Sequence, residues 1–140
     1  YRFNLLPFSR AVDRLTWGEL FFPLGVIGAA FISSDKWIFI AAVLVLGLAD
    51  AAAALVGKAL GKHKYKIFNH TKSLEGSTAF FITALIILAL ITFIVPSGLA
   101  TTWPVIISLA LLATIVEAIA PWGMDNLLLP ILVAAALKLL

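Results

Sequence analysis

Three carboxylates interrupt segments of this chain that are otherwise apolar. Asp50 follows the run LVLGLA, Glu117 lies near the end of a run that begins at residue 103, and Asp125 opens the last apolar run. An ionised carboxylate inside a membrane is costly unless it is paired, bound to a metal or facing water. We therefore predict that these acids are functional, while pairing with nearby lysines as structural anchors stays open as the alternative.

A basic segment lies beside the first of these acids. Residues 58–76 hold five lysines and two histidines, and glycines flank several of them. Carboxylates that hold a divalent cation, next to cationic groups that hold phosphates, indicate phosphoryl or nucleotidyl transfer. The sequence contains no G-x-x-x-x-G-K-[ST], G-x-S-x-G or H-E-x-x-H motif, which excludes a P-loop. The histidines lack a third ligand, so a zinc site is not expected.

A proline in the last apolar run gives a further indication. Pro130 removes one amide donor and displaces the carbonyl of Asn126, four residues earlier. The Asp125 carboxylate, the Asn126 side-chain amide and this freed carbonyl are oxygen ligands of the kind that Mg²⁺ prefers. An ordinary proline kink is the alternative.

The composition assigns the chain to the membrane proteins. Of 140 residues, 63% are hydrophobic and 12% charged, with a mean hydropathy of +1.12, whereas soluble domains carry about 25% charged residues. Apolar runs recur to the last residue, so we predict an all-α, polytopic integral membrane helical bundle. The first residue is Tyr rather than Met, and we expect an amino-terminal part to be missing. The absence of cysteine excludes disulfides and thiolate sites.

Five segments approach the length of roughly 20 residues that a membrane-spanning helix needs. We predict one transmembrane domain over residues 1–140, with an interfacial segment at 1–17 and a basic nucleotide-binding loop at 58–76. The predicted spans lie at about 18–34, 37–57, 77–95, 103–120 and 126–140.

The distribution of positive charge predicts the orientation of these spans. Alternating spans place residues 1–17, 58–76 and 121–125 on one side, and that side holds eight of the ten basic residues. Because lysine and arginine concentrate in cytoplasmic loops, we expect a multi-pass protein whose basic loops and active site face the cytoplasm. Lys36 and Lys138 fall on the other side.

The second predicted span carries a stripe of small residues that includes an acid. Gly47, Asp50, Ala54, Gly57 and Gly61 recur at spacings of three and four. Small residues allow another helix to approach closely. Helix packing therefore explains the glycines and the alanine, although it does not explain the aspartate.

Several of these elements together resemble the CTP-dependent polyprenol kinase family, which includes dolichol kinase, phytol kinase and the CTP-using diacylglycerol kinases. The resemblance extends from about Trp17 onward, and phosphatidate cytidylyltransferase is similar at a greater distance. The similar elements are Trp17-Gly18-Glu19-Leu20-Phe21-Phe22-Pro23-Leu24-Gly25, the series Asp50, Ala53, Gly57, Gly61 and Lys62, the run Lys72-Ser73-Leu74-Glu75-Gly76-Ser77, and Glu117 with Asp125-Asn126 and Pro130.

The resemblance implies that CTP donates its γ-phosphate to a membrane-embedded lipid alcohol, an isoprenoid alcohol such as phytol or dolichol, or diacylglycerol, with Mg²⁺ as cofactor. The expected partners are CTP, the lipid alcohol and the bilayer, without nucleic acid. We assign Asp50 and Asp125 to Mg²⁺, and Glu117 either to the metal shell or to the hydroxyl proton, so that all three are catalytic. The predicted nucleotide-binding residues are Gly57, Gly61, Lys62, Lys72, Ser73, Glu75, Gly76 and Asn126.

Two other functions stay open. A cytidylyltransferase would direct a lipid phosphate at the α-phosphorus of CTP and release pyrophosphate. A small membrane transporter would place polar groups at mid-depth, but residues 85–90 and 107–112 are apolar apart from Ser108.

Lys64 and Lys66 are interpreted as plain charges of the cytoplasmic side that contact lipid headgroups.

Overall fold

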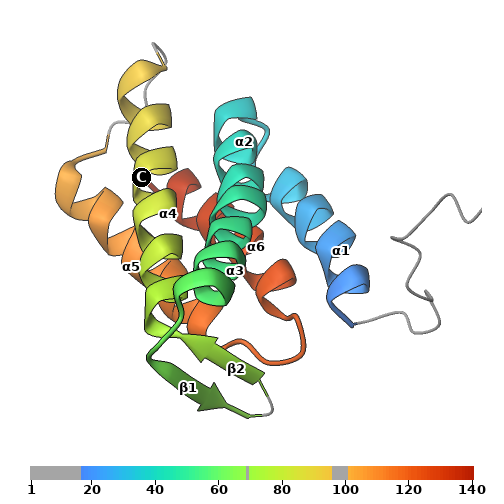
Figure 1. Ribbon diagram of the computed structural model, residues 1–140. Coiled ribbons are helices and arrows are strands. Elements are labelled where there is room, and N and C mark those ends of the chain that lie inside the picture. The colour runs from blue at the N-terminus through green and yellow to red at the C-terminus, as the bar shows by residue number, and fades with distance from the viewer. Residues whose placement is uncertain (1–16, 69, 96–100) are drawn as a thin grey trace, which may run out of the picture.

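The computed structural model describes residues 17–68, 70–95 and 101–140, and within them helices pack side by side with a β-hairpin at one end (Figure 1). The predicted interfacial segment at 1–17 lies outside the described residues, except for Trp17. The elements are α1 Trp17–Ile32, α2 Lys36–Leu44, the π-helix η1 Val45–Ala49, α3 Asp50–Leu60, β1 Lys64–Ile67, β2 His70–Ser73, α4 Leu74–Ile94, α5 Trp103–Ile119 and α6 Asp125–Lys138.

The helices occupy the apolar segments that the sequence predicts. α2, η1 and α3 form one continuous helix over Lys36–Leu60, which, like α4, is long and apolar enough to cross a membrane. α1 and α5 are apolar but shorter. The architecture is therefore compatible with an all-α membrane protein, and the number of spans stays a prediction.

Residues 58–76 do not form one loop, as the sequence predicts, but include helix ends and a β-hairpin. α3 continues to Leu60, and α4 already begins at Leu74 because the Ser73 hydroxyl caps it by accepting a hydrogen bond from the Gly76 amide at 3.1 Å. Between them, β1 and β2 pair antiparallel, with Lys64 opposite Ser73 and Ile67 opposite His70. The alternation Lys-Tyr-Lys-Ile is the strand signal in the sequence, but it covers only four residues.

Small side chains fill much of the interior, and many large ones lie outside. Ala41, Ala49, Ala84 and Ala110 are fully buried, together with a few larger residues such as Phe80. The exposed large hydrophobic residues include Phe31, Leu55, Ile94 and Ile115. Small residues at helix interfaces with large apolar ones outside are the arrangement expected where lipid, rather than water, contacts the outer surface.

The polar groups gather at one end of the bundle. Figure 1 shows the hairpin at the same end as the last turn of α3, the start of α4, the end of α5 and the start of α6. The hairpin and the turn between α5 and α6 are in contact there, because the His70 ring accepts a hydrogen bond from the Trp122 amide. The basic segment and the turn at 121–125, which the charge distribution predicts on one side, therefore lie together.

Candidate active site

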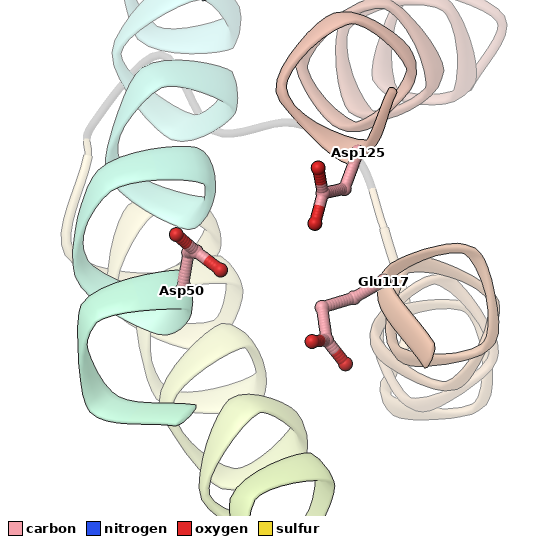
Figure 2. A group of neighbouring side chains, drawn as sticks. All are labelled: Asp50, Glu117 and Asp125. Carbon is pink, nitrogen blue, oxygen red and sulfur yellow. The ribbon is translucent and has the colours of Figure 1, made fainter. Parts of the chain in front are cut away.

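The three acids converge between helices. Asp50 is the first residue of α3, Glu117 lies in the last turn of α5, and Asp125 is the first residue of α6. One carboxylate oxygen from each lies within 4.8 Å of the other two. Figure 2 shows the side chains directed toward one another across the space between the helices. The fold thus brings together three carboxylates that span 75 positions of the sequence (125 − 50).

Lys72, from strand β2, contacts two of the three acids. Its Nζ donates a hydrogen bond to Glu117 Oε1 at 2.7 Å and another to the Glu117 carbonyl oxygen, and it lies 3.6 Å from Asp125 Oδ2. Within this cluster of four residues, three ionised carboxylates and one ammonium group leave two negative charges. A divalent cation would balance this charge.

One buried carboxylate oxygen of the cluster has no hydrogen-bond partner among the described residues. Glu117 is 5% exposed, and its Oε2 is buried without a hydrogen bond. The other buried side-chain atoms without a partner among the described residues are the hydroxyls of Thr92 and Thr101, and neither residue lines the cavity beside the acids. A buried, unpaired carboxylate oxygen is costly. Its position among two other acids fits a cation that binds oxygen ligands, such as Mg²⁺.

A cavity of about 440 Å³ opens above the acids, a volume typical of small-molecule sites. Its lining is both acidic and basic, because lysines from α3 and the hairpin lie in it together with Asp50, Glu117 and Asp125. The other lining residues are small or carry hydroxyl groups. The basic residues are Lys58, Lys64 and Lys72, and the remainder are Ala53, Ala54, Gly57, Thr71, Ser73, Gly76 and Ser77.

Some of these lining residues were missed by the sequence analysis. Lys64, which was interpreted as a plain surface charge, lines the cavity together with Lys58, Thr71 and Ser77. Lys64 pairs with Ser73 across the hairpin, so the strand register carries it to the site. The alternation within β1 is the signal that could have identified it.

The glycines of the predicted stripe have different surroundings: Gly57 and Gly61 pack close to the start of α4, whereas Gly47 does not. A Cβ added to Gly76 would lie 2.9 Å from the Ala53 carbonyl oxygen and 3.2 Å from the Gly57 Cα, so α3 and α4 approach backbone to backbone beside the cavity. A Cβ on Gly61 would lie 2.8 Å from the Ser73 hydroxyl, although Gly61 does not line the cavity. Gly47 lies in the π-helix with no atom near its missing Cβ, and therefore takes no part in this packing.

Two predicted nucleotide-binding residues have side chains placed elsewhere. Glu75 accepts hydrogen bonds from the His63 amide at 3.2 Å and pairs with the His63 ring at 2.7 Å, which ties the start of the hairpin to α4. Tyr65 strengthens this attachment by hydrogen bonding to Ser77 at 2.7 Å. Lys62 is exposed and does not line the cavity.

Asn126 also points away from the acids. Its side-chain amide donates to the Gly18 carbonyl oxygen in α1 at 3.1 Å, beside a second, smaller cavity. The carbonyl of Asn126, which Pro130 displaces, lies against Gly25, where an added Cβ would overlap it. Of the expected oxygen ligands at the start of α6, only the Asp125 carboxylate lies with Asp50 and Glu117.

Comparison with known proteins finds one similar protein, which is a kinase. No family model matches the chain, and no solved structure matches it. The phytol kinase of Synechocystis sp. is 31% identical over 134 residues, which are 94% of this chain and 58% of the relative. The chain thus spans a little over half of the length of this relative. The match covers the segments that hold all three acids and the hairpin, and it supports the resemblance to the family that includes phytol kinase.

Proposed function

We propose that this chain forms the phosphoryl-transfer site of a membrane lipid kinase that uses CTP, Mg²⁺ and a membrane-embedded lipid alcohol. The observation that carries the proposal is the convergence of Asp50, Glu117 and Asp125 around Lys72 at the floor of a cavity lined by lysines. The similarity to phytol kinase supports a lipid alcohol as the acceptor.

Asp50 and Asp125 would hold the Mg²⁺ ion. When bound, Mg²⁺ neutralises the charge of the phosphates and orients them for transfer. Glu117, through its unpartnered Oε2, would either complete this metal site or accept the proton of the lipid hydroxyl. These two roles differ in their consequences, because the first controls Mg²⁺ affinity and the second controls the pH profile of turnover.

The lysines of the cavity would hold the polyphosphate. Lys72 lies among the acids, whereas Lys58 and Lys64 line the cavity from α3 and β1. A triphosphate that extends from the acids toward the hairpin would therefore meet positive charge along its length. Ser73 and Gly76, which also line the cavity, would leave room beside it for the nucleotide.

The proposed reaction needs no covalent enzyme intermediate. The oxygen of the lipid hydroxyl forms a bond to the γ-phosphorus of CTP while the bond from that phosphorus to the β–γ bridging oxygen breaks. CDP leaves with the electron pair, and the hydroxyl proton passes to Glu117 or to water. Because Asp50 lies within the continuous apolar helix Lys36–Leu60, the alcohol would approach from the membrane and the nucleotide from the hairpin side.

The deciding experiment supplies labelled CTP to the full-length protein in membranes. The mixture contains Mg²⁺, isoprenoid alcohols, diacylglycerol and phosphatidate, with CTP labelled at either the γ- or the α-phosphorus. Lipid label from γ-labelled CTP alone is the expected result, and the labelled product identifies the alcohol. Lipid label from α-labelled CTP would instead show a cytidylyltransferase, while no label from either would favour a transporter.

Carboxamide variants test whether the acids do the chemistry. Asp50→Asn and Glu117→Gln should each lower turnover at least about a hundredfold. Lys36→Ala is the control, because Lys36 is exposed at the start of α2 and lies over the Trp37 ring rather than near the cavity. Near-normal turnover in both carboxamide variants would contradict the catalytic assignment.

A further inference from the structure

One face of the hairpin contacts three separate parts of the bundle. Tyr65 and Lys72 are cross-strand partners, and His70 lies two residues from Lys72 on the same strand, so their side chains share a face. Tyr65 reaches Ser77 in α4, and Lys72 reaches Glu117 in α5. His70 reaches the turn between α5 and α6. Lys72 therefore has one contact with the bundle directly across from it, at Tyr65, and another nearer the hairpin tip, at His70.

The tip contact has a polar and an apolar part. The Trp122 amide donates a hydrogen bond to His70 Nε2 at 3.2 Å, and the rings of Phe68 and Trp122 lie 6.2 Å apart. Phe68 and His70 are each separated from Trp122 by more than 50 positions in the sequence. Neither part involves an acidic group.

The turn that receives the tip has an uncommon backbone conformation. Trp122 has φ +50° and Gly123 has φ +78°, and left-handed values are uncommon for a residue such as tryptophan. A Cβ added to Gly123 would lie 2.6 Å from the Gly18 Cα in α1. The turn connects the helices that carry Glu117 and Asp125, and it is held by α1 on one side and by the hairpin tip on the other.

We propose that His70 and Trp122 are positioning residues that clamp the hairpin tip to this turn and thereby set Lys72 against Glu117 and Asp125. The consequence for CTP rests on the proposed function, whereas the clamp itself rests on the contacts alone. Among the described residues, neither His70 nor Trp122 lines the cavity.

The clamp restrains the tip of the hairpin, whereas the contacts of His63 with Glu75 and of Tyr65 with Ser77 restrain its root. A two-stranded hairpin is at best marginally stable by itself. The bonds from Lys72 to Glu117 and Asp125 compete with any cation that the acids bind. The contact between His70 and Trp122 does not compete with a cation, so it keeps the hairpin, with Lys64 and Lys72, over the cavity when the acids are otherwise engaged.

Substitutions at the tip separate the hydrogen bond from the ring contact. His70→Phe keeps an aromatic ring but removes the acceptor, whereas His70→Gln keeps an acceptor on a flexible side chain. Trp122→Ala removes the ring that meets Phe68. The matched control is Trp103→Ala, because Trp103 is 54% exposed against 55% for Trp122 and also pairs with a phenylalanine ring, that of Phe93.

Distance measurements on the full chain test the clamp without relying on activity. The chain contains no cysteine, so nitroxide labels can be placed at Lys66→Cys on the hairpin and Ile119→Cys at the exposed end of α5. We expect one narrow distance distribution, which broadens toward longer distances in His70→Phe and Trp122→Ala. The narrow distribution should return in His70→Gln and stay unchanged in Trp103→Ala. An unchanged distribution in both tip variants would overturn the clamp.

Kinetics then test the positioning role. His70→Phe should raise the KM for CTP about tenfold while kcat changes less than threefold, and His70→Gln should restore KM to within twofold. If the distance distribution broadens in His70→Phe while the KM for CTP stays unchanged, the positioning role is overturned. If the parent protein shows no CTP-dependent labelling, the proposed function fails, and the distance distributions still decide whether the clamp exists.

Discussion

Two regions meet at the first turn of α6, and they are built in opposite ways. Asp125 faces the cavity, where its carboxylate lies near two other acids and Lys72. Asn126, the next residue, faces α1 and bonds to the Gly18 carbonyl oxygen. Successive residues on a helix are rotated by about 100°, so neighbours in sequence serve different sites.

The cavity side of α6 depends on charged groups, whereas the side that faces α1 depends on glycines, which have no side chain. At the cavity, helices and the hairpin deliver carboxylates and lysines to a shared space. At the α1–α6 contact, Gly25 and Gly28 allow the helix to lie against the Asn126 carbonyl and Ile131. Substitutions at the cavity should therefore change turnover or the response to Mg²⁺, whereas substitutions at the α1–α6 contact should change stability alone.

The largest effect is expected at the acid that starts α6. Asp125→Asn keeps the shape of the side chain but removes the charge that, with Asp50, would hold Mg²⁺. Turnover should fall at least about a hundredfold, and the Mg²⁺ concentration for half-maximal activity should rise. Assays in membranes across a Mg²⁺ titration measure both. Unchanged Mg²⁺ dependence would remove Asp125 from the proposed metal site.

The next effect concerns the cation between the acids. Lys72→Met leaves the buried Glu117 without its charged partner, which should lower the free energy of unfolding by about 2 to 3 kcal/mol. Added Mg²⁺ should then raise the Tm of the variant more than that of the parent, because it replaces the lost positive charge. Thermal unfolding in detergent, with and without Mg²⁺, measures this difference. Lys36→Met is the control, and an equal Mg²⁺ response would contradict the shared cation site.

A smaller effect is expected at the contact between α1 and α6. A Cβ at Gly25 would overlap the Asn126 carbonyl and lie 2.8 Å from Pro130 Cγ, whereas one at Gly28 would meet only side-chain atoms of Ile131, at 3.0 Å. Gly25→Ala should therefore lower the free energy of unfolding by about 1 to 2 kcal/mol, and Gly28→Ala should cost less because Ile131 can move. Equal losses of Tm in the two variants would show that backbone contact does not control this interface.

The smallest effect is expected at Asn126. Asn126→Ala removes one hydrogen bond to Gly18 and should cost about 1 kcal/mol of stability. The KM for CTP should change less than threefold, in contrast to the loss of turnover at Asp125. A tenfold rise in KM at unchanged stability would instead support the nucleotide-binding role that the sequence predicts for Asn126.

Some residues that belong to one motif are separated by the fold, and a residue outside the motifs reaches the cavity. Lys62 and Glu75 belong to the run of motif residues, yet Lys62 is exposed and Glu75 pairs with His63. Lys64, which belongs to none of the motif residues, lines the cavity. Spacing along the chain could not decide these cases, because the pairing of Lys64 with Ser73 depends on the hairpin register.

The sequence by itself identified Asp50, Glu117 and Asp125 as candidate functional acids, and it determined the helical segments that carry them. Both are local properties, since the cost of a carboxylate in an apolar run and the preference of that run for a helix depend on nearby residues. Only the tertiary structure decided that the three acids share one space with Lys72, that Asn126 faces α1, and that the hairpin tip rests on Trp122. These follow from helix rotation and strand register, which contacts between distant segments control.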